Sequence, residues 1–453
     1  MTYYYQRRRS IFSGLIFILI GVIFLLYELH PEFPIGHLFR RYWPLILIVW
    51  GVAHLVEHLL ATRTGGPRPS GISGGEIALM IVLFMVVASI AGYDWVRKQN
   101  PDIDFDMGDV FDHSYDWTND LPAVSAKPNE VISIITQRGN ISVSPSSDSE
   151  IHVSVHKSAR GENENEARQL ADKVRVSMNR TGDGFQIEPQ ETGGEASDVR
   201  VDLDIRLPAQ AGITADTTHG DITVAQMTGP VTIHSQSGDL EIHNITGDVS
   251  IEMAHGDIRA NNIKGNVRLT GGGGEVNLSA ISGDATVEGD FYGPIRAQNI
   301  DNTVRYTSSL TSLTLVHLTG QLEMDSGDLT ISDQPGGVQL RTTNKDVTLE
   351  NVAGRIDLTD QRGDVEVTFK QPPRDEILIA DQSGNIDLTL PAQSSFEISA
   401  VSRSGEIDND FGSSGLKSSN NSDTTVLEGA FGTHGPHITL NTSYGTISIH
   451  KAQ

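Results

Sequence analysis

Gly220-Asp221-Ile222-Thr223-Val224 opens the stretch that decides the fold, which runs from Gly220 to Val287. A glycine, then Asp, Asn, Glu or Pro, then an apolar residue return every nine residues, at Gly229-Pro230-Val231, Gly238-Asp239-Leu240, Gly247-Asp248-Val249, Gly256-Asp257-Ile258, Gly265-Asn266-Val267, Gly274-Glu275-Val276 and Gly283-Asp284-Ala285. Counted from each glycine, positions three and five are apolar, which is the alternation of a short half-buried strand. Glycine suits a corner that needs positive φ, and the adjacent Asp or Asn can bond local backbone. The fixed short period predicts a solenoid, whose rungs bury their apolar faces against neighbouring rungs.

Alternate nine-residue units differ at position eight. One set has an apolar residue there (Met227, Ile245, Ile263 and Ile281), whereas the other has Gln236, Ala254, Gly272 and Asp290. The true rung therefore has about 18 residues. We predict an all-β fold, a single-stranded β-helix (a single-chain solenoid) with two or three short strands per rung and right-handed winding.

Charge divides the chain into a basic head and an acidic body. The 453 residues carry a net charge of −25 and contain no cysteine. Residues 1–98 hold nine of the 33 basic and five of the 58 acidic residues, so 24 basic and 53 acidic residues, a net −29, remain in 99–453. Such a body would repel nucleic-acid phosphates, so nucleic acid is excluded as a partner. The missing cysteines exclude disulfides, thiol catalysis and thiolate metal sites.

Residues 1–98 are predicted to be an α-helical transmembrane region. Apolar runs near 11–29, 43–60 and 77–93 indicate three spans, and the first has 19 residues with no small-residue cleavage site after it. Arg7-Arg8-Arg9 before the first span places the N-terminus in the cytoplasm, and three crossings then deliver the solenoid to the outer side. A tight hairpin of the first two spans is the alternative, and it would leave the solenoid in the cytoplasm. The lipid bilayer is a partner under both topologies.

The remainder divides into three parts. Residues 99–128 read as an acidic linker, 129–218 as an N-terminal β cap with one helix over 164–178, and 219–453 as the β-solenoid. The corner glycines are missing near residues 302 and 311, where the register weakens.

Two parts of the chain resemble known families. The Gly-Asp-apolar-x-apolar repeat, the Leu207-Pro208 strand end with its echo at Leu390-Pro391, and Thr442-Ser443-Tyr444-Gly445-Thr446-Ile447 resemble the bacterial "putative adhesin" β-solenoid domain family of unknown function. The apolar runs with Gly21-Val22-Ile23-Phe24 and Trp43-Pro44-Leu45-Ile46 resemble the multi-span region of LiaI/LiaF-like envelope-stress proteins. Together these resemblances imply a multi-pass protein of the bacterial cytoplasmic (inner) membrane.

Two N-terminal motifs imitate metal sites. His54-Leu55-Val56-Glu57-His58 spells the H-x-x-E-H pattern of inverted zincins, but it lies at the polar end of a predicted span, without a third ligand. Asp102, Asp104 and Asp106 imitate the start of a calcium loop, yet Met107 and His113 stand where an EF-hand needs glycine and glutamate. Membrane-end side chains and a solvated acidic linker are the favoured interpretations.

Three features of the repeats also resemble functional sites. Gly271-Gly272-Gly273-Gly274-Glu275 comes near the calcium-binding RTX nonapeptide, but turn chemistry explains the corner aspartates better. Asp357 and Asp360 form a pair of acids of the kind that glycan-cleaving β-helices use, although acids occur on almost every rung. His219, His234, His243 and His255 recur near corners, where stacking would make a pH- or metal-sensitive strip. No catalytic, cofactor-binding or metal residue is predicted, and no cofactor.

Two functions of different classes remain open. The first is a non-enzymatic envelope protein that displays the solenoid for adhesion, scaffolding or envelope-stress sensing, with an envelope protein or cell-wall glycan as partner. The second is a membrane-tethered β-helix enzyme acting on polysaccharide. Convergent carboxylates with stacked aromatic residues in a groove would favour the enzyme.

Overall fold

The computed structural model describes most of the chain after residue 112. The described residues are 113–161, 163–182, 184–191, 199–412, 415–421 and 423–452. The three predicted spans lie outside them, as does the first part of the expected linker. Within these described ranges, no helix has the length and apolarity needed to cross a membrane. Residues 113–120, expected as part of the linker, form strand β1 (His113–Asp120).

The chain divides into two compact units. The smaller unit takes in 1–116, 158–173 and 193–199, and its described helix is α4 (Glu164–Lys173). The Asn163 side chain accepts a hydrogen bond from the Glu166 amide at 3.0 Å and so caps the helix. The apolar spacing predicted a helix as far as residue 178. It ends at Lys173 instead, because the β-branched Val174 opens strand β6 (Val174–Thr181).

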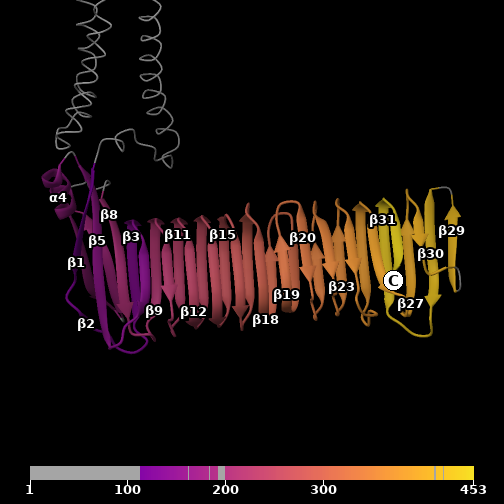
Figure 1. The fold of residues 1–453 in the computed structure, drawn as a ribbon, viewed down its shortest axis with the longest axis horizontal. Coiled ribbons are helices and arrows are strands. Elements are labelled where there is room, and N and C mark those ends of the chain that lie inside the picture. Colours follow the sequence, from indigo (N-terminus) through magenta and orange to yellow (C-terminus); the bar gives the residue numbers. More distant parts are fainter. Residues whose placement is uncertain are drawn as a thin grey trace, which may run out of the picture. The chain divides into compact units, whose positions relative to one another are not determined.

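The larger unit takes in 117–157, 174–192 and 200–453, and its strands stack into two long rows (Figure 1). Sheet 1 contains, in stacking order, β8 (Val199–Leu207), β4 (Ile141–Pro145), β10 (Ile222–Ala225), β12 (Leu240–Thr246), β14 (Ile258–Lys264), β16 (Val276–Ile281), the first part of β18 (Ile295–Thr307), the last part of β19 (Ser312–Met324), β20 (Asp328–Ser332), β22 (Asp346–Glu350), β24 (Val365–Thr368), β26 (Ile386–Pro391), β32 (Ile447–Ala452) and β28 (Ile407–Asn409). Strands β1 and β2 (Val124–Ser125) pair with β5 (Glu150–Gly161), which also pairs with β8.

Sheet 2 is built from the strands that alternate with these along the chain. It contains β6, β7 (Gly184–Glu191), β3 (Val131–Arg138), β9 (Gly212–His219), β11 (Val231–Ser237), β13 (Val249–His255), β15 (Val267–Gly273), β17 (Ala285–Phe291), the last part of β18, the first part of β19, β21 (Val338–Arg341), β23 (Ile356–Asp360), β25 (Ile377–Ser383), β31 (His437–Tyr444), β27 (Phe396–Ser402), β30 (Thr424–Phe431) and β29 (Leu416–Asn421). Both ends of sheet 2 are antiparallel pairs, β6 with β7 and β29 with β30.

The register confirms the 18-residue rung, which has two strands. Leu240 of β12 pairs with Ile222 of β10 and with Ile258 of β14, and each partner lies 18 residues away. The glycine corners make this close stacking possible. Gly238 has φ of +134°, and a Cβ there would lie 2.1 Å from the Gly220 carbonyl oxygen. A side chain would therefore force the rungs apart.

The apolar positions face inward as the sequence predicts. Ile242 and Ile251 are almost completely buried, whereas their neighbours Glu241 and Ser250 are exposed. The third apolar position of alternate units, represented by Ile245, is buried as well. The core is thus a continuous apolar column between the two sheets.

A left-handed residue before this third position was not foreseen. Asn244 has φ of 60° and Asn262 has φ of 54°, and a positive φ recurs one rung earlier and later at Gln226 and Ala280. Strict alternation would turn the third apolar residue outward. The extra left-handed residue works as a bulge that turns it back into the core. The Asn262 amide donates to the Asn244 side-chain oxygen at 2.6 Å, which joins successive bulges.

One rung in the middle of the stack runs in the opposite direction to the rungs on either side of it. Strand β18 pairs in parallel with β16 and β17, but β19 lies antiparallel to β18, and β20 and β21 lie antiparallel to β19. The chain turns back at 308–311, where the Ser308 amide donates to the Thr311 carbonyl at 2.8 Å. This reversal explains the missing corner glycines near residues 302 and 311. The predicted β-helix is therefore confirmed as a solenoid-like stack of long parallel sheets, and corrected from one continuous winding to two stacks joined by a reversed rung.

Candidate functional site

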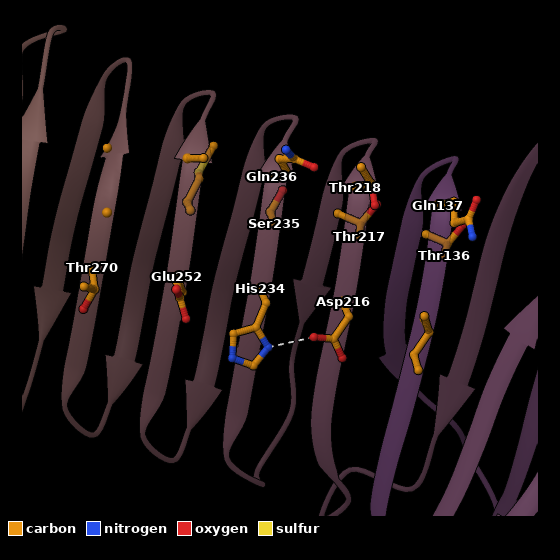
Figure 2. Close-up of a pocket in the computed structure, with 15 residues that line it drawn as sticks. Thr136, Gln137, Asp216, Thr217, Thr218, His234, Ser235, Gln236, Glu252 and Thr270 are labelled. Carbon is orange, nitrogen blue, oxygen red and sulfur yellow. Dashed lines mark hydrogen bonds and ion pairs between the residues drawn. The ribbon is translucent and has the colours of Figure 1, made fainter. Parts of the chain in front are cut away.

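A groove of about 730 Å³ crosses sheet 2 over five neighbouring rungs (Figure 2). The register lines up one residue from each strand, because Asp216 pairs with Ile135 and His234, and Glu252 with His234 and Thr270. We call Asp216, His234, Glu252 and Thr270 the outer row. Gln137, Thr218, Gln236, Ala254 and Gly272 also line the groove. This groove was not predicted, although writing the sequence in 18-residue lines would have shown the row.

The outer row holds one ion pair. His234 Nδ1 lies 2.8 Å from an Asp216 carboxylate oxygen, and both side chains are more than a third exposed. Neighbouring rungs repeat at about 4.8 Å, so the row offers polar groups at that spacing. Carboxylates, amides and hydroxyls in this arrangement can hydrogen-bond an elongated polar ligand. Among the described residues that line the groove, none is Phe, Tyr or Trp.

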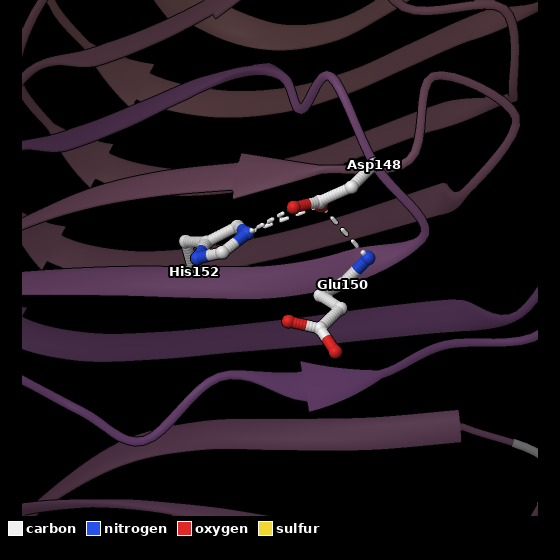
Figure 3. Close-up of side chains that lie close together, drawn as sticks. All are labelled: Asp148, Glu150 and His152. Carbon is white, nitrogen blue, oxygen red and sulfur yellow. Dashed lines mark hydrogen bonds and ion pairs between the residues drawn. The ribbon is translucent and has the colours of Figure 1, made fainter.

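A second cluster lies at the turn between β4 and β5 (Figure 3). Asp148, Glu150 and His152 each offer one atom that could bind a metal, and these three atoms lie within 4.8 Å of one another. His152 Nε2 lies 3.1 Å from both Asp148 carboxylate oxygens, and the Glu150 amide donates to one of them at 3.0 Å. The Glu150 amide and then His152 hold the pKa of Asp148 below its usual range.

These contacts are typical of a turn, and they account for the close approach of the three side chains. An Asp that accepts from the amide two residues on is a common turn motif, and the group is exposed. Asp-x-Glu-x-His at alternate positions was the sequence signal, because such spacing puts the three side chains on one side of a strand. The same three donors would suit a divalent cation, but nothing further in the cluster points to one.

Comparison with known proteins assigns the two parts of the chain. A family model described as Toastrack DUF4097 matches residues 129–450. The chain belongs to the Toastrack DUF4097 family. A model of the LiaI-LiaF-like transmembrane region matches residues 11–55, so the N-terminal part is a membrane region. No curated protein matches the chain significantly.

Solved structures similar to the Toastrack domain have low sequence identity. A "putative cell adhesion protein" from Clostridium sporogenes is 10% identical, covers 75% of this chain and 100% of its own, and has a TM-score of 0.18. A "putative lipid binding protein" from Parabacteroides distasonis is 11% identical, with 75% and 97% coverage and a TM-score of 0.26. A "putative adhesin" from Bacteroides fragilis is 10% identical, with 75% and 97% coverage and a TM-score of 0.21. At these scores none of the likenesses carries an argument about function.

The corner aspartates of the Toastrack domain accept backbone hydrogen bonds, but from the amide 18 residues further on in the next rung and not, as the sequence predicts, from the local backbone. The Asp239 amide donates to the Asp221 carboxylate at 2.9 Å, and the Asp257 amide donates to the Asp239 carboxylate at 2.9 Å. A second column repeats the bond with Asn266, whose side-chain oxygen accepts from the Asp284 amide at 2.9 Å. Each corner carboxylate thus ties its rung to the next one.

The histidines of the Toastrack domain are not brought together into one strip. His219 and His255 share a column but are separated by Ser237, because the register pairs Ser237 with each of them. His234 pairs with Asp216 in the groove. His243 belongs to sheet 1, 4.0 Å from Glu241.

Two groups of candidate residues remain, the Asp357 and Asp360 pair and the N-terminal motifs. Asp357 and Asp360 leave β23 on opposite faces, since Asp357 is partly exposed and Asp360 is only 2% exposed. The pair therefore does not converge on a surface groove. His54, Glu57 and His58 lie outside the described residues, together with Asp102, Asp104 and Asp106.

Proposed function

We propose that this protein is a membrane-anchored, non-enzymatic bacterial envelope protein that displays its Toastrack domain for adhesion, scaffolding or envelope-stress sensing. The membrane-region match at 11–55 precedes the Toastrack match at 129–450, so the domain is tethered through its N-terminal side. Within the domain we propose the right-handed winding of a single-chain β-helix on each side of the reversed rung.

The observation that carries the proposal is the length of the ordered stack. Sheet 1 contains fourteen described strands, each stacked on the next from β8 at one end to β28 at the other. At about 4.8 Å per strand, that is a rod about 60 Å long. Because successive rungs follow the chain, tethering at the N-terminal side leaves the C-terminal rungs at the far end. Such a geometry displays the C-terminal rungs at a distance from the tether.

The groove in sheet 2 is the surface we propose for partner binding. Its outer row offers alternating acidic, imidazole and hydroxyl groups, which suits an elongated polar partner such as a cell-wall glycan or a segment of an envelope protein. The net charge of −29 over 99–453 disfavours polyanions, nucleic acid among them.

The groove also bears on the alternative of a polysaccharide-cleaving enzyme. Sugar-cleaving grooves combine two carboxylates with a platform for the sugar. Asp216 and Glu252 supply carboxylates, but the described lining contains no stacking ring, and Asp216 is engaged by His234. Full-length protein should therefore release no reducing ends from cell-wall glycan. Release that is abolished by Glu252→Gln would instead establish the enzyme.

Topology is the decisive experiment. We propose three crossings, with Arg7, Arg8 and Arg9 inside and the Toastrack domain outside the cytoplasm. Protease added to intact spheroplasts should then cut near 101–112 and release a large resistant fragment, because the stacked rungs protect the backbone. A cytoplasmic protein should stay uncut as the control, and the uncleaved chain should remain in the membrane after a high-salt wash. Cleavage only after lysis would establish the hairpin topology and a cytoplasmic scaffold.

A further inference from the structure

A column of polar side chains runs inside the solenoid at the last inward position of the sheet 2 strands. We call it the inner polar column, and its members are Thr136, Thr217, Ser235, Asp360, Asp381, Thr442 and Ser402, each less than a tenth exposed. The register stacks Asp360 on Asp381, Asp381 on Thr442, and Thr442 on Ser402. In the central rungs Met253 and Gly271 occupy the same position.

The hydroxyl members at the C-terminal end are hydrogen-bond donors to the glycine corners. Thr442 Oγ1 donates to the Gly384 carbonyl oxygen at 3.1 Å, and Ser402 Oγ donates to the Gly445 carbonyl oxygen at 2.8 Å. These bonds fasten the inner end of one rung to the corner of the next. A donor at this position can therefore satisfy a corner carbonyl, as it does at these two rungs. It is not used at every rung, because the Thr136, Thr217 and Ser235 hydroxyls have no hydrogen-bond partner and Met253 has no donor.

The two aspartates stand at the same position, and of their four carboxylate oxygens Asp360 Oδ1 accepts a hydrogen bond, from the Gln361 amide at 2.7 Å. Asp360 is 2% and Asp381 is 6% exposed, and neither Asp360 Oδ2 nor either Asp381 carboxylate oxygen has a hydrogen-bond partner. A Cβ on Gly384 would lie 2.7 Å from Asp381 Oδ2 and 1.9 Å from the Gly363 carbonyl oxygen, so the carboxylate and the carbonyl share one small space. Asp360 Oδ2 shares the space at Gly363 with the Lys345 carbonyl oxygen in the same way. Two acceptors facing each other without a proton repel.

The charges around the pair do not neutralise it. Asp346 and Asp381 lie near enough to Asp360 to raise its pKa, and Asp364 does the same to Asp381, and all of these neighbours are acidic. Lys345 is the basic group near Asp360, but its ammonium donates to the Asp325 carbonyl oxygen, and Asp325 and Asp328 also draw on its charge. The strands above and below contribute the uncharged Thr442 and Thr342.

Burial is the main cause of a raised pKa at both carboxyls. It raises the pKa of Asp360 to about 6, and the acids Asp381 and Asp346 add to the effect against the amides of Gln361 and Arg362. Burial raises the pKa of Asp381 as well, and the Gln382 and Ser383 amides offset this only in part, because they do not reach hydrogen-bond geometry.

We propose that Asp360 and Asp381 form a buried acid-sensitive clasp, in which mild acidification protonates the carboxyl groups and lets them donate hydrogen bonds to the carbonyl oxygens of Lys345 and Gly363, as Thr442 and Ser402 donate to their own corners. The clasp closes the rungs of β23, β25 and β31 as the pH falls. It opens when both groups ionise, since two buried carboxylates then face each other and the corner carbonyls.

The sign of the pH dependence follows from linkage. A carboxyl whose pKa is raised on folding stabilises the fold fully below its unfolded pKa, and this contribution is lost as the pH rises through the folded pKa. For Asp360, the rise from 3.8 to about 6 makes the opening equilibrium of these rungs about tenfold larger at pH 7 than at pH 5. Exposed aspartates with lowered pKa, such as Asp290 and Asp333, act in the opposite sense, but only near pH 4 and below.

The test is amide hydrogen exchange of the full-length protein in detergent at about pH 5 and pH 7. Rates are divided by the intrinsic rate of unstructured amides at the same pH, so that they report the opening equilibrium. Peptides from β23 and β25 should exchange about tenfold more slowly at pH 5, whereas peptides from β14 and β16, which contain no histidine, should not change. Equal corrected rates at both pH values in β23 and β25 would overturn the clasp.

Variants assign the effect to the two carboxyls. The double variant Asp360→Asn, Asp381→Asn carries amide donors at every pH, so its corrected rates at pH 7 should match the wild-type rates at pH 5. The double variant Asp360→Thr, Asp381→Thr, which copies Thr442 at both positions, provides the same test if the asparagine variant does not fold. Asp357→Asn is the matched control, because it removes the same charge from the outer face of the same strand. Survival of the pH response in the double variant, or its loss in Asp357→Asn, contradicts the proposal.

Discussion

Ile242 and Glu241 are adjacent in the chain but lie in opposite environments. The Ile242 side chain is fully buried between the sheets, and Glu241 is exposed. Ile242→Asp should unfold the Toastrack domain or lower its stability by on the order of 3–5 kcal/mol, because the core offers no partner for the charge. Glu241→Lys should leave the melting temperature nearly unchanged. Thermal melts of both variants check the register, and equal damage from the two changes would show that it is wrong.

The corner aspartates permit a finer test of turn chemistry. Asp239→Asn should be mild, because an Asn oxygen accepts the same amide bond, as Asn266 already does one column away. Asp239→Ala should cost about 1 kcal/mol, since the Asp257 amide loses its acceptor. Melts of the wild type with calcium and with chelator should coincide. A midpoint many degrees higher in calcium would make the corners metal ligands.

At the level of elements, the 18-residue rung should behave as a removable unit. Deleting 238–255 joins Ser237 to Gly256 and puts β14 in the register that β12 now occupies, so the shortened domain should fold with a melting temperature within a few degrees of the wild type. Deleting only 238–246 would send a sheet 2 strand into sheet 1 and lose the Asn244 bulge. That variant should lose its cooperative transition in circular dichroism, and equal behaviour of the two deletions would contradict the two-strand rung.

The sequence predicted the elements that depend on side-chain alternation and on glycine. The rung length and the inward positions follow from those two signals, whereas the bonds that the corner aspartates make to the next rung do not. The bulges were missed although Asn244 and Asn262 are of a residue type that tolerates a positive φ, because Gln226 and Ala280 break that pattern in the adjoining rungs. Stacking on the equivalent residues of adjacent rungs imposes the positive φ at these positions. The conformational preference of the residue type alone does not predict it.

The reversed rung and the buried acids were missed for different reasons. Alternation reads the same in both chain directions, so β19 cannot be told from a parallel strand by its pattern. Asp360 was read as one of many exposed acids. The alternation of Ile356 and Leu358 in β23 does point it inward, and that was the available signal. The groove depends on side chains four rungs apart, which only the folded register brings to one surface.

At the scale of the whole molecule, both strongly acidic composition and rung stacking bear on solubility. Rungs inside the stack have both hydrogen-bonding edges paired, so an open edge is left only at the ends, and repulsion among surface carboxylates opposes contact between copies. The net charge gives the end rungs no special protection, because the acidic residues are spread over all the rungs.

The antiparallel strands at the two ends of sheet 2 provide that protection. A stack ending on a bare parallel rung would present a template for the first rung of another copy, and head-to-tail addition without closure grows filaments. Here β6 lies antiparallel to β7 at one end and β29 antiparallel to β30 at the other. Strand β29 is exposed over most of its length and carries Lys417, a residue that blunts an open edge. The end strands thus limit polymerisation through sheet 2. Sheet 1 ends on β28, which is parallel to β32 but has only 3 residues, and so short an edge is a poor template. The length of the rod is then set by the number of rungs in one chain.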